Sequence, residues 1–167
     1  MGHTCNSIII NASYDLVFDI SNDIPRWTEL FGSEYKKAEI VSKVDNKITF
    51  KLTDDEDKTW QSWRLLFKDK YFTYAERETP LMPFKFMKII WLYAPKPSGM
   101  ALAKGSQTLP DRQAGTSFCP VELTWIQHFE MDEKAKFNDE QVEGFINKHS
   151  KDNLKIFKEA IEKAARS

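Results

Sequence analysis

The sequence lacks the features that mark several common classes of protein. Its 167 residues include only two cysteines, Cys5 and Cys119, which lie too far apart for a zinc-ligand spacing and offer no disulfide framework. No apolar run approaches the roughly 18 residues that a membrane span needs, and residues 1–10 show no basic segment followed by an apolar core, as a signal peptide would. We therefore expect a cytoplasmic protein with reduced thiols and no membrane association.

An excess of charge of one sign is also absent. The chain has 24 Lys and Arg against 25 Asp and Glu, which leaves a formal net charge of -1. A nucleic-acid-binding domain would need a clustered basic excess, so no nucleic-acid partner is predicted. The balance still permits a small basic patch that could dock an acidic carrier protein.

Histidine and glycine are scarce and form no familiar catalytic or metal-binding pattern. The three histidines are scattered, without the spacing of a zinc site. His128 falls on the strand face opposite Trp125 and is expected to point outward, whereas His149 is expected to be a core histidine. The acidic run 54–58 lacks the ligand spacing of a calcium loop, and the chain has neither a phosphate-cradling glycine loop nor a nucleophile elbow. No metal or cofactor is therefore predicted.

Aromatic side chains, by contrast, are abundant, with 12 Phe, 5 Trp and 5 Tyr. They supply large flat apolar surfaces, with polar tips on Trp and Tyr. In the alternating stretch 59–67, Trp60, Ser62 and Arg64 share one strand face, because successive side chains of a strand point to opposite sides. Aromatic and polar groups on a common inward face are typical of a lined pocket.

Arg64 on that face has two interpretations. It could be a buried structural ion pair with Glu76 or Glu78 across the hairpin. Alternatively, it could face a cavity as an electrostatic anchor for a ligand.

Hydrophobic periodicity predicts strands early and in the middle of the chain and helices near both ends. Asn11 or Ser13 is the expected N-cap of the first short helix, Asp23 is the expected cap of the second, in which Pro25 occupies the first turn, and Asn138 caps the long helix. The expected elements are a strand at 4–11, short helices around 14–20 and 25–31, strands at 35–42, 47–53, 60–67, 71–78, 84–93 and 121–131, and a helix at 139–165.

This order predicts an α+β fold in a single domain, residues 1–167. Consecutive hairpins imply a curved antiparallel sheet of about seven strands, and the long helix must bury its apolar stripe against it, leaving an internal cavity. Residues 95–120, with four prolines and three glycines, form a loop insertion that is either functional or mobile. The expected stripe is Val142, Phe145, Ile146, His149, Asn153, Ile156, Phe157, Ala160 and Ala164.

Several segments together resemble the START-like helix-grip proteins. More narrowly, they resemble the monodomain, tetracenomycin-type aromatase/cyclases of bacterial aromatic polyketide synthesis. The resemblance runs nearly end to end, apart from the long loop. The segments are NDIPRWTELFGSEY (22–35), WQSWR (60–64), AERETPLMPFKFM (75–87), WLY (91–93), WIQHFEM (125–131) and NKHSKDNLKIFKEAIE (147–162).

The resemblance implies an enzyme that receives a poly-β-ketone chain from an acyl carrier protein of a minimal polyketide synthase. Such an enzyme closes a ring by aldol chemistry and aids loss of water to give an aromatic polyketide, without a cofactor. Two alternatives are a non-catalytic START-like carrier of a lipid, isoprenoid quinone or other flat ligand, and an interaction module of a synthase complex.

The resemblance also implies roles for individual residues. Arg64 would anchor developing oxyanions, Tyr35 would donate a proton, and Ser62 would orient a carbonyl or a water. An ordered water is our expectation for the base. The residues expected to bind substrate are Trp27, Phe31, Trp60, Ser62, Arg77, Phe84, Met87, Trp91, Trp125, Gln127 and Asn153.

The chain departs from the family pattern in two places. Gly32 is inserted in FGSEY, just before Tyr35, and the 95–120 segment is about twenty residues longer than a usual hairpin connection. Arg77 is open to two interpretations, as a second pocket donor or as an ion-pair partner for Glu29 or Glu34.

Overall fold

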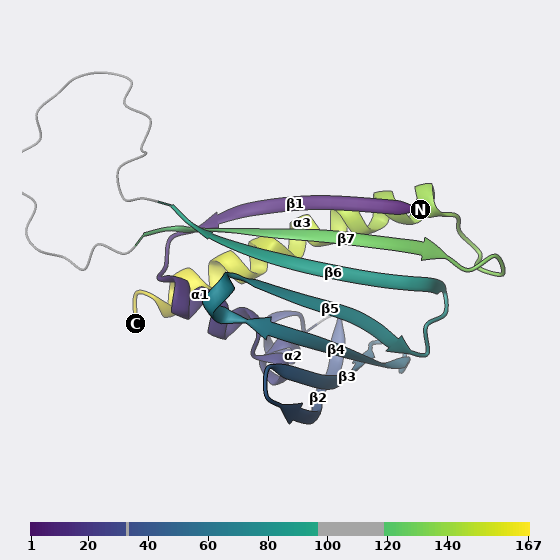
Figure 1. Ribbon diagram of the computed structural model, residues 1–167, viewed down its shortest axis with the longest axis horizontal. Helices are drawn as coiled ribbons and strands as arrows, with labels where there is room; N and C mark the ends of the chain where they lie inside the picture. Colours follow the sequence, from purple (N-terminus) through teal and green to yellow (C-terminus); the bar gives the residue numbers. More distant parts are fainter. Residues whose placement is uncertain (33, 97–118) are drawn as a thin grey trace, which may run out of the picture.

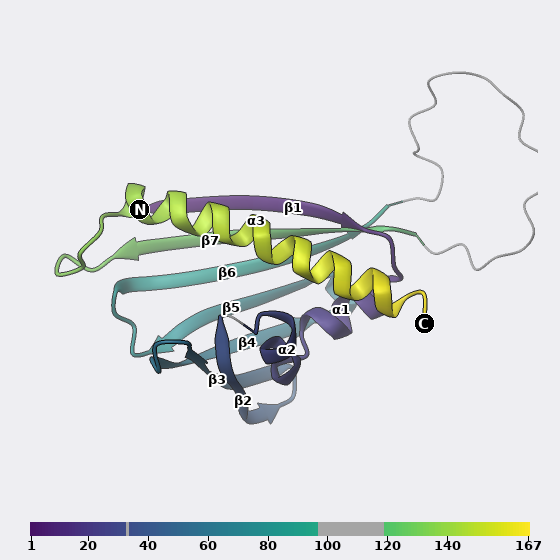
Figure 2. The same ribbon diagram turned by 180° about the vertical axis from the view of Figure 1, so that it is seen from behind.

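The computed structural model describes residues 1–32, 34–96 and 119–167. In this part of the chain, seven strands form one antiparallel sheet in the order β1-β7-β6-β5-β4-β3-β2, and a long helix, α3, lies across it (Figures 1 and 2). The elements in chain order are β1 (Gly2–Ile10), α1 (Tyr14–Ser21), η1 (Ile24–Arg26), α2 (Trp27–Leu30), β2 (Tyr35–Val44), β3 (Lys47–Asp54), β4 (Thr59–Phe67), η2 (Lys68–Lys70), β5 (Phe72–Thr79), β6 (Phe84–Pro95), β7 (Val121–Met131) and α3 (Asp139–Ala164).

The predicted α+β helix-grip architecture is confirmed. Strands β2 to β6 follow one another as hairpins, β7 returns beside β6, and β1 pairs with β7 at the far edge. At that edge the backbone of β1 lies very close to the side chain of Phe129 on β7, because a Cβ on Gly2 would lie 2.2 Å from Cζ of that ring. The interior is enclosed by the curved sheet, by α3, and by the two short helical segments that follow β1 (Figure 2).

The two short helical segments begin in different ways. Ser13 caps α1, since its Oγ accepts a hydrogen bond from the backbone N–H of Leu16. Asn11, the other candidate, instead donates to the Glu162 carboxylate on α3. Pro25 lies in a 3₁₀ turn that leads into α2, but Asp23 makes no side-chain cap, so that part of the prediction was wrong.

The long helix begins as predicted and differs from the prediction along its stripe. Asn138 and Gln141 form a reciprocal capping box. Val142 and Phe157 are buried, but Phe145, which was expected in the stripe, is 63% exposed and contacts only the ring of Phe137 among the described aromatic side chains. Val142 and Ile146 of the same half of the helix pack against Phe129 and Met131 of β7, so Phe145 lies on the exposed side of α3.

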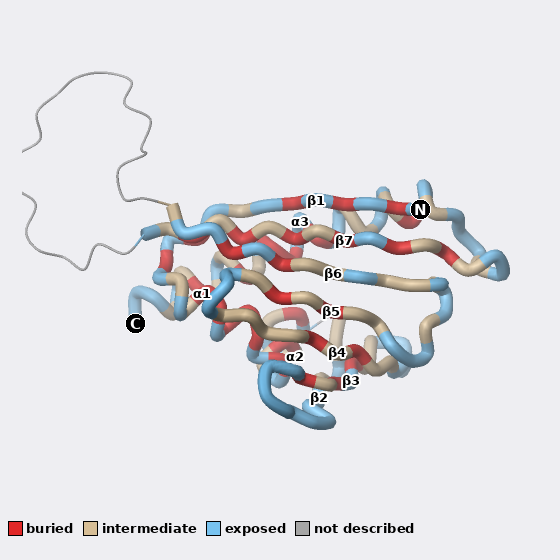
Figure 3. Tube along the Cα trace, in the orientation of Figure 1, coloured by how far each residue is buried: buried red, intermediate tan, exposed pale blue. Residues whose placement is uncertain are grey.

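The buried core follows the inner sheet face and the short helices (Figure 3). Its centre is an aromatic stack in which Trp91 and Trp125 lie parallel, with ring centroids 4.5 Å apart and an interplanar angle of 6°. Phe157 of α3 meets both rings edge-on at 5.7 Å. Helix and sheet are thus joined through flat side chains that also form part of a cavity wall.

The ends of the predicted loop insertion lie side by side. The backbone N–H of Lys96 donates to the carbonyl of Pro120 at 2.7 Å, which continues the pairing of β6 with β7. Residues 97–118 are outside the described residues, so the expectation about the 95–120 insertion stays a prediction. Within the described chain, no helix has the length and apolar character to cross a membrane.

Candidate active site

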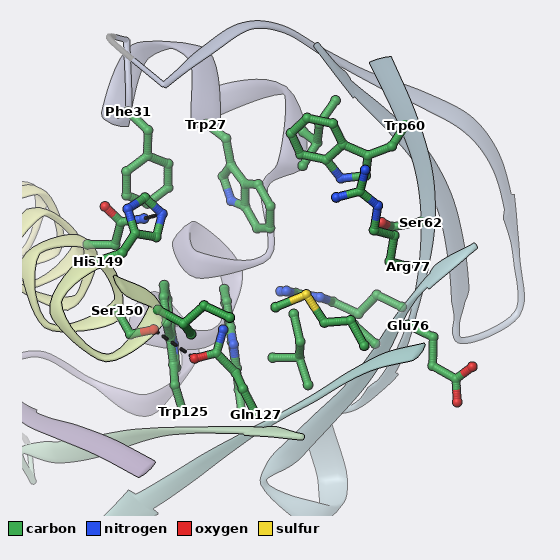
Figure 4. A pocket seen from close by; sticks show the side chains of 18 of the residues that line it. Trp27, Phe31, Trp60, Ser62, Glu76, Arg77, Trp125, Gln127, His149 and Ser150 are labelled. Carbon is green, nitrogen blue, oxygen red and sulfur yellow. Dashed lines mark hydrogen bonds between the residues drawn. The ribbon is translucent and has the colours of Figure 1, made fainter. Parts of the chain in front are cut away.

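A cavity of about 270 Å³ lies between the inner sheet face and α3. It is lined by side chains from β2 to β7, from α3, and from the segment around α2 (Figure 4). Every predicted site residue lines it, and their chemical roles remain predictions. The predicted residues that it brings together are Trp27, Phe31, Tyr35, Trp60, Ser62, Arg64, Arg77, Phe84, Met87, Trp91, Trp125, Gln127 and Asn153.

Sequence reasoning missed a second set of lining residues. Phe50 and Leu52 of β3 pair with Ser62 and Trp60 of β4, and therefore share their inward face. That hairpin register was a usable signal for both. The helix residues had no such signal, because their approach to the sheet depends on tertiary packing. The missed lining residues are Phe50, Leu52, Ala75, Glu76, Ile89, Ile146, His149, Ser150 and Phe157.

Arg64 is the central charged group of the cavity, with only 2% of its surface exposed. Its Nη1 donates to Oδ1 of Asn22 at 2.8 Å, and the guanidinium carbon lies 3.8 Å from the ring centroid of Trp91 and 5.1 Å from that of Trp27. Nε is buried without a hydrogen-bond partner. Aromatic faces and one amide therefore hold this cation.

The predicted alternative, an ion pair of Arg64 with Glu76 or Glu78, is wrong. Arg64 pairs in register with Ala75, so the adjacent carboxylate of Glu76 belongs to the opposite sheet face and points away from the cavity (Figure 4). Glu76 accepts a hydrogen bond from Tyr74, and Glu78 accepts one from Gln61. In the described residues, no carboxylate lies within ion-pair distance of Arg64.

Burial lowers the pKa of Arg64 to about 10, which still leaves it charged at neutral pH. Asn22, the acceptor for Nη1, is fixed in turn because its Nδ2 donates to the Phe18 carbonyl at 2.7 Å and to the Tyr93 hydroxyl at 2.9 Å. Asn22 and Tyr93 were not predicted as site residues. Asn22 positions the guanidinium and is itself held by Tyr93, while Arg64 lines the cavity.

Tyr35 lies in an aromatic corner, with its ring about 6 Å from the rings of Trp27, Phe31 and Trp60. Burial raises its pKa well above the usual range, and the charge and hydrogen bond of Glu34 raise it further, while the charge of Arg64 opposes them. Tyr35 is thus a protonated phenol at neutral pH and can act as a donor.

Gln127 is held by two hydroxyl groups that both donate to its Oε1. Thr4 donates at 2.9 Å and Ser150 at 2.7 Å, and all three side chains are buried. Because the carbonyl end of the amide is occupied, the amide nitrogen is directed toward the cavity (Figure 4). This arrangement presents a fixed N–H donor to a bound ligand.

We expect the double variant Thr4→Val/Ser150→Ala to lose about 2 kcal/mol of unfolding free energy, because it leaves a buried carbonyl without a partner. Ser150→Ala alone should cost only about 1 kcal/mol, since Thr4 still donates. Urea denaturation measures both, with Ser150→Thr as the control that keeps the hydroxyl. Equal stability of the double variant and the wild type would contradict the assigned network.

Arg77 of β5 pairs in register with Ser62 of β4, and both residues line the cavity. Its Nε donates to the Pro80 carbonyl at 2.9 Å and its Nη2 to the Met82 carbonyl at 3.2 Å, while the guanidinium carbon lies 4.9 Å from the ring centroid of Trp60. Burial lowers its pKa. In the described residues, no carboxylate forms an ion pair with it, so the alternative pairing with Glu29 or Glu34 is wrong.

His149 was expected to be a core histidine, and the structure corrects this. Its side chain is 51% exposed, and its Nε2 lies 2.9 Å from Oε1 of Glu34. Asn153 donates through Nδ2 to Oε2 of Glu34 at 3.0 Å, and this Nδ2 also lies 3.1 Å from Nε2. His128, as predicted, is exposed on the outer face, where its Nε2 lies 3.2 Å from Nδ1 of His3.

In the Glu34–His149 pair, the two pKa values shift in opposite directions. Hydrogen bonding to Glu34 raises the pKa of His149 above 6.5. The pKa of Glu34 falls below 4.5 because the hydrogen bond and charge of His149 outweigh the effect of burial. The pair therefore makes its full contribution to stability between pH 4.5 and pH 6.5, the ordinary pKa values of Glu and His. Its contribution decreases as the pH rises through the pKa of His149 or falls through that of Glu34.

The described residues contain no group of three or more His, Cys, Asp or Glu side chains that could hold a metal ion. The cavity instead combines flat aromatic walls with four hydrogen-bond donors, namely the buried cation of Arg64, the phenol of Tyr35, the hydroxyl of Ser62 and the amide of Gln127. Such a set can bind and polarise several carbonyl oxygens of one ligand.

Comparison with known proteins gives relatives along nearly the whole chain, although no family model matches it. A Streptomyces cyaneus protein is 34% identical over 171 residues, which cover 98% of this chain and 96% of the relative. A Streptomyces halstedii protein is 42% identical over 108 residues, covering 60% of this chain and 95% of the relative. Both carry the name "Putative polyketide cyclase".

Solved structures with the same fold include two aromatase/cyclases. The Zhui aromatase/cyclase from a Streptomyces species has a TM-score of 0.69 and 15% identity, covering 98% of this chain and 93% of that one. The di-domain aromatase/cyclase BexL has a TM-score of 0.70 and 16% identity, covering 97% of this chain and 47% of that one. A START-superfamily protein from Mycobacterium smegmatis has a TM-score of 0.61 and 9% identity, covering 99% and 98%. At these identities the likeness shows the fold.

Proposed function

The chain belongs to the polyketide cyclases, and from that premise we propose that it catalyses regiospecific aldol cyclisation and aromatising dehydration of a poly-β-ketone tethered to an acyl carrier protein. The observation that carries this proposal is Arg64, a buried cation without a carboxylate partner among the described residues, held beside an aromatic cavity. A purely apolar ligand would give no reason to keep a charge there, because burying a charge costs free energy.

The reaction requires control more than strong acid or base. A methylene between two carbonyls is already acidic, but a flexible poly-β-ketone can close in several ways. Flat walls such as the Trp91–Trp125 stack restrict how the chain folds. Holding the reacting carbons together removes part of the entropic barrier, on the order of several kcal/mol. The walls of the cavity thus select which ring forms.

Charge develops on oxygen as the carbon–carbon bond closes. Arg64 is placed to stabilise the enolate and alkoxide oxygens, and one such preorganised donor typically contributes about 3–4 kcal/mol to the transition state. Tyr35 donates a proton to the new alkoxide or to the departing hydroxyl. Ser62 and the fixed amide of Gln127 orient further carbonyls along the chain.

The partners in this proposal are the acyl carrier protein that bears the chain and the minimal polyketide synthase that builds it, and the product is an aromatic polyketide. The proposed route for the tethered chain passes the exposed side chain of His149 on α3, which lines the cavity. The reaction as proposed uses no cofactor.

The test is the product profile of a reconstituted minimal polyketide synthase with and without this protein. We expect addition of the protein to shift the products from a mixture of misfolded cyclisation products to one aromatic compound. An unchanged product profile, together with a flat lipid or quinone that co-purifies with the protein, would instead support a non-catalytic carrier.

A further inference from the structure

Arg64 is held by an acceptor that carries no charge. Its Nη1 donates to Oδ1 of Asn22 at 2.8 Å, and Asn22 is buried at the C-terminal end of α1. Apart from burial, the groups that act on the pKa of Arg64 are the hydroxyls of Tyr93 and Tyr35, and no carboxylate is among them. An amide thus sets the direction of the cation without neutralising it.

The orientation of the Asn22 amide is fixed by its neighbours on both sides. The Phe18 carbonyl can only accept a hydrogen bond, so the group that lies 2.7 Å from it must be Nδ2. A guanidinium can only donate, so the group that faces Arg64 must be Oδ1. The two requirements agree, and a flipped amide would lose both hydrogen bonds.

A second layer of hydroxyl groups holds Asn22 in place. Its Nδ2 also donates to the Tyr93 hydroxyl at 2.9 Å, and Ser21 donates through Oγ to the Phe18 carbonyl at 3.2 Å. That bond uses the hydrogen of the Ser21 hydroxyl, so Tyr93 is the donor in the 2.9 Å contact between the two hydroxyls. Burial raises the pKa of Tyr93, which keeps it a neutral phenol. The cluster of Ser21, Asn22 and Tyr93 therefore carries no charge at neutral pH.

A carboxylate in place of the Asn22 amide would hold the guanidinium more firmly, through a charge-assisted hydrogen bond. It would also cancel most of the attraction that the cation exerts on a ligand in the cavity, because the two opposite charges would act on that ligand in opposite directions. The guanidinium carbon of Arg64 lies 3.8 Å from the ring centroid of Trp91, which is part of the cavity wall. The weaker, neutral acceptor keeps the positive charge effective at that wall.

We propose that Asn22 is a positioning residue that aims the guanidinium of Arg64 and leaves its charge free to act on an anionic oxygen of the substrate. The proposal rests on the proposed function, because it concerns the oxyanion that forms as the ring closes. Arg64 is the catalytic residue in that step, and Asn22 acts through it. The same arrangement gives the cavity a preference for flat anionic ligands over neutral ligands of the same shape.

The first test needs no polyketide synthase and compares two flat probes of similar size, 2-naphthoate and the neutral ketone 2-acetylnaphthalene. The ratio of their dissociation constants, measured by calorimetry, gives the anion preference. The wild type should bind 2-naphthoate about tenfold more tightly. In Asn22→Asp this preference should fall about tenfold, because the new carboxylate neutralises the guanidinium. Affinity for 2-acetylnaphthalene should change by less than about threefold, since that probe carries no net charge.

Asn22→Ala is the matched control, because it removes the acceptor without adding a charge. It should keep the anion preference of the wild type within about threefold. An equal anion preference in Asn22→Asp and the wild type would overturn the proposal, as would a wild type that binds the two probes equally. A loss of both probes to the same extent in Asn22→Asp would show a merely structural role for Asn22 and would overturn the proposal too.

The second test is product profiling in the reconstituted minimal synthase, with urea denaturation to show that each variant is folded. Asn22→Ala should lose about tenfold or more of the correctly cyclised product, because a catalytic group displaced by about 1 Å can cost about 100-fold in rate. Full product control by folded Asn22→Ala would overturn the aiming role, even if Asn22→Asp proves too unstable to assay. A wild type without effect on products would overturn the proposed function instead, and the two probes would still test the role of Asn22.

Discussion

Arg64→Met is expected to abolish control of ring closure while leaving the protein at least as stable as the wild type. Methionine fills a similar volume against Trp91 and Trp27 but carries no charge. Loss of a preorganised donor to a developing oxyanion typically costs a factor of about 10²–10³ in rate. Misfolded cyclisation products should then dominate the profile.

The stability half of this prediction follows from the partners of Arg64. The guanidinium is buried with one hydrogen bond, to Asn22, and with Nε unpaired. Removing it relieves the cost of a desolvated charge and leaves Asn22 Oδ1 without this donor, a loss of about 1 kcal/mol. We therefore expect a free energy of unfolding that is unchanged or up to about 2 kcal/mol higher.

Urea denaturation measures the stability of Arg64→Met, and product profiling in the reconstituted synthase measures its control of ring closure. Arg64→Lys is the matched control, because it keeps the charge but loses the planar face that lies over Trp91. It should retain part of the control over products. A loss of about 3–5 kcal/mol of stability in Arg64→Met would show instead that the arginine holds the fold together.

The inward face of the central strands could be predicted from the sequence because strand periodicity is local. Trp60, Ser62 and Arg64 alternate with outward residues in a single stretch, and the same rule placed Trp125 and Gln127 on one face of β7. These faces converge on the cavity because the sheet curves. The proton-donor role of Tyr35, unlike the placement of these strand residues, came from the resemblance.

What could not be predicted depends on contacts between distant segments. Asn22 reaches Arg64 across 42 positions, and Glu34 reaches His149 across 115. Helical periodicity put Phe145 and His149 on the apolar stripe, but it could not show that Phe145 is exposed or that His149 lies beside Glu34. The ion-pair alternative for Arg64 failed for a local reason, since register places Ala75 opposite it.

Phe157→Ala should produce the largest loss of stability among single changes at the cavity. The ring is fully buried, with its centroid 4.9 Å from that of Phe31 and 5.7 Å from those of Trp91 and Trp125. Removing a buried phenyl ring costs about 3–5 kcal/mol, through lost burial and the void that remains. Stabilities of small domains are about 5–15 kcal/mol, so the variant should unfold at a much lower urea concentration.

Phe145→Ala on the same helix is the matched control, because that ring is 63% exposed and contacts only Phe137 among the described aromatic side chains. It should change the free energy of unfolding by less than about 0.5 kcal/mol. Phe157 connects α3 to the stacked tryptophans, so its loss should also widen the cavity and broaden the product profile of the folded fraction. A stability cost below about 1.5 kcal/mol for Phe157→Ala would mean that the helix is held to the sheet by its other contacts. The aromatic stack would then serve the cavity wall rather than the fold.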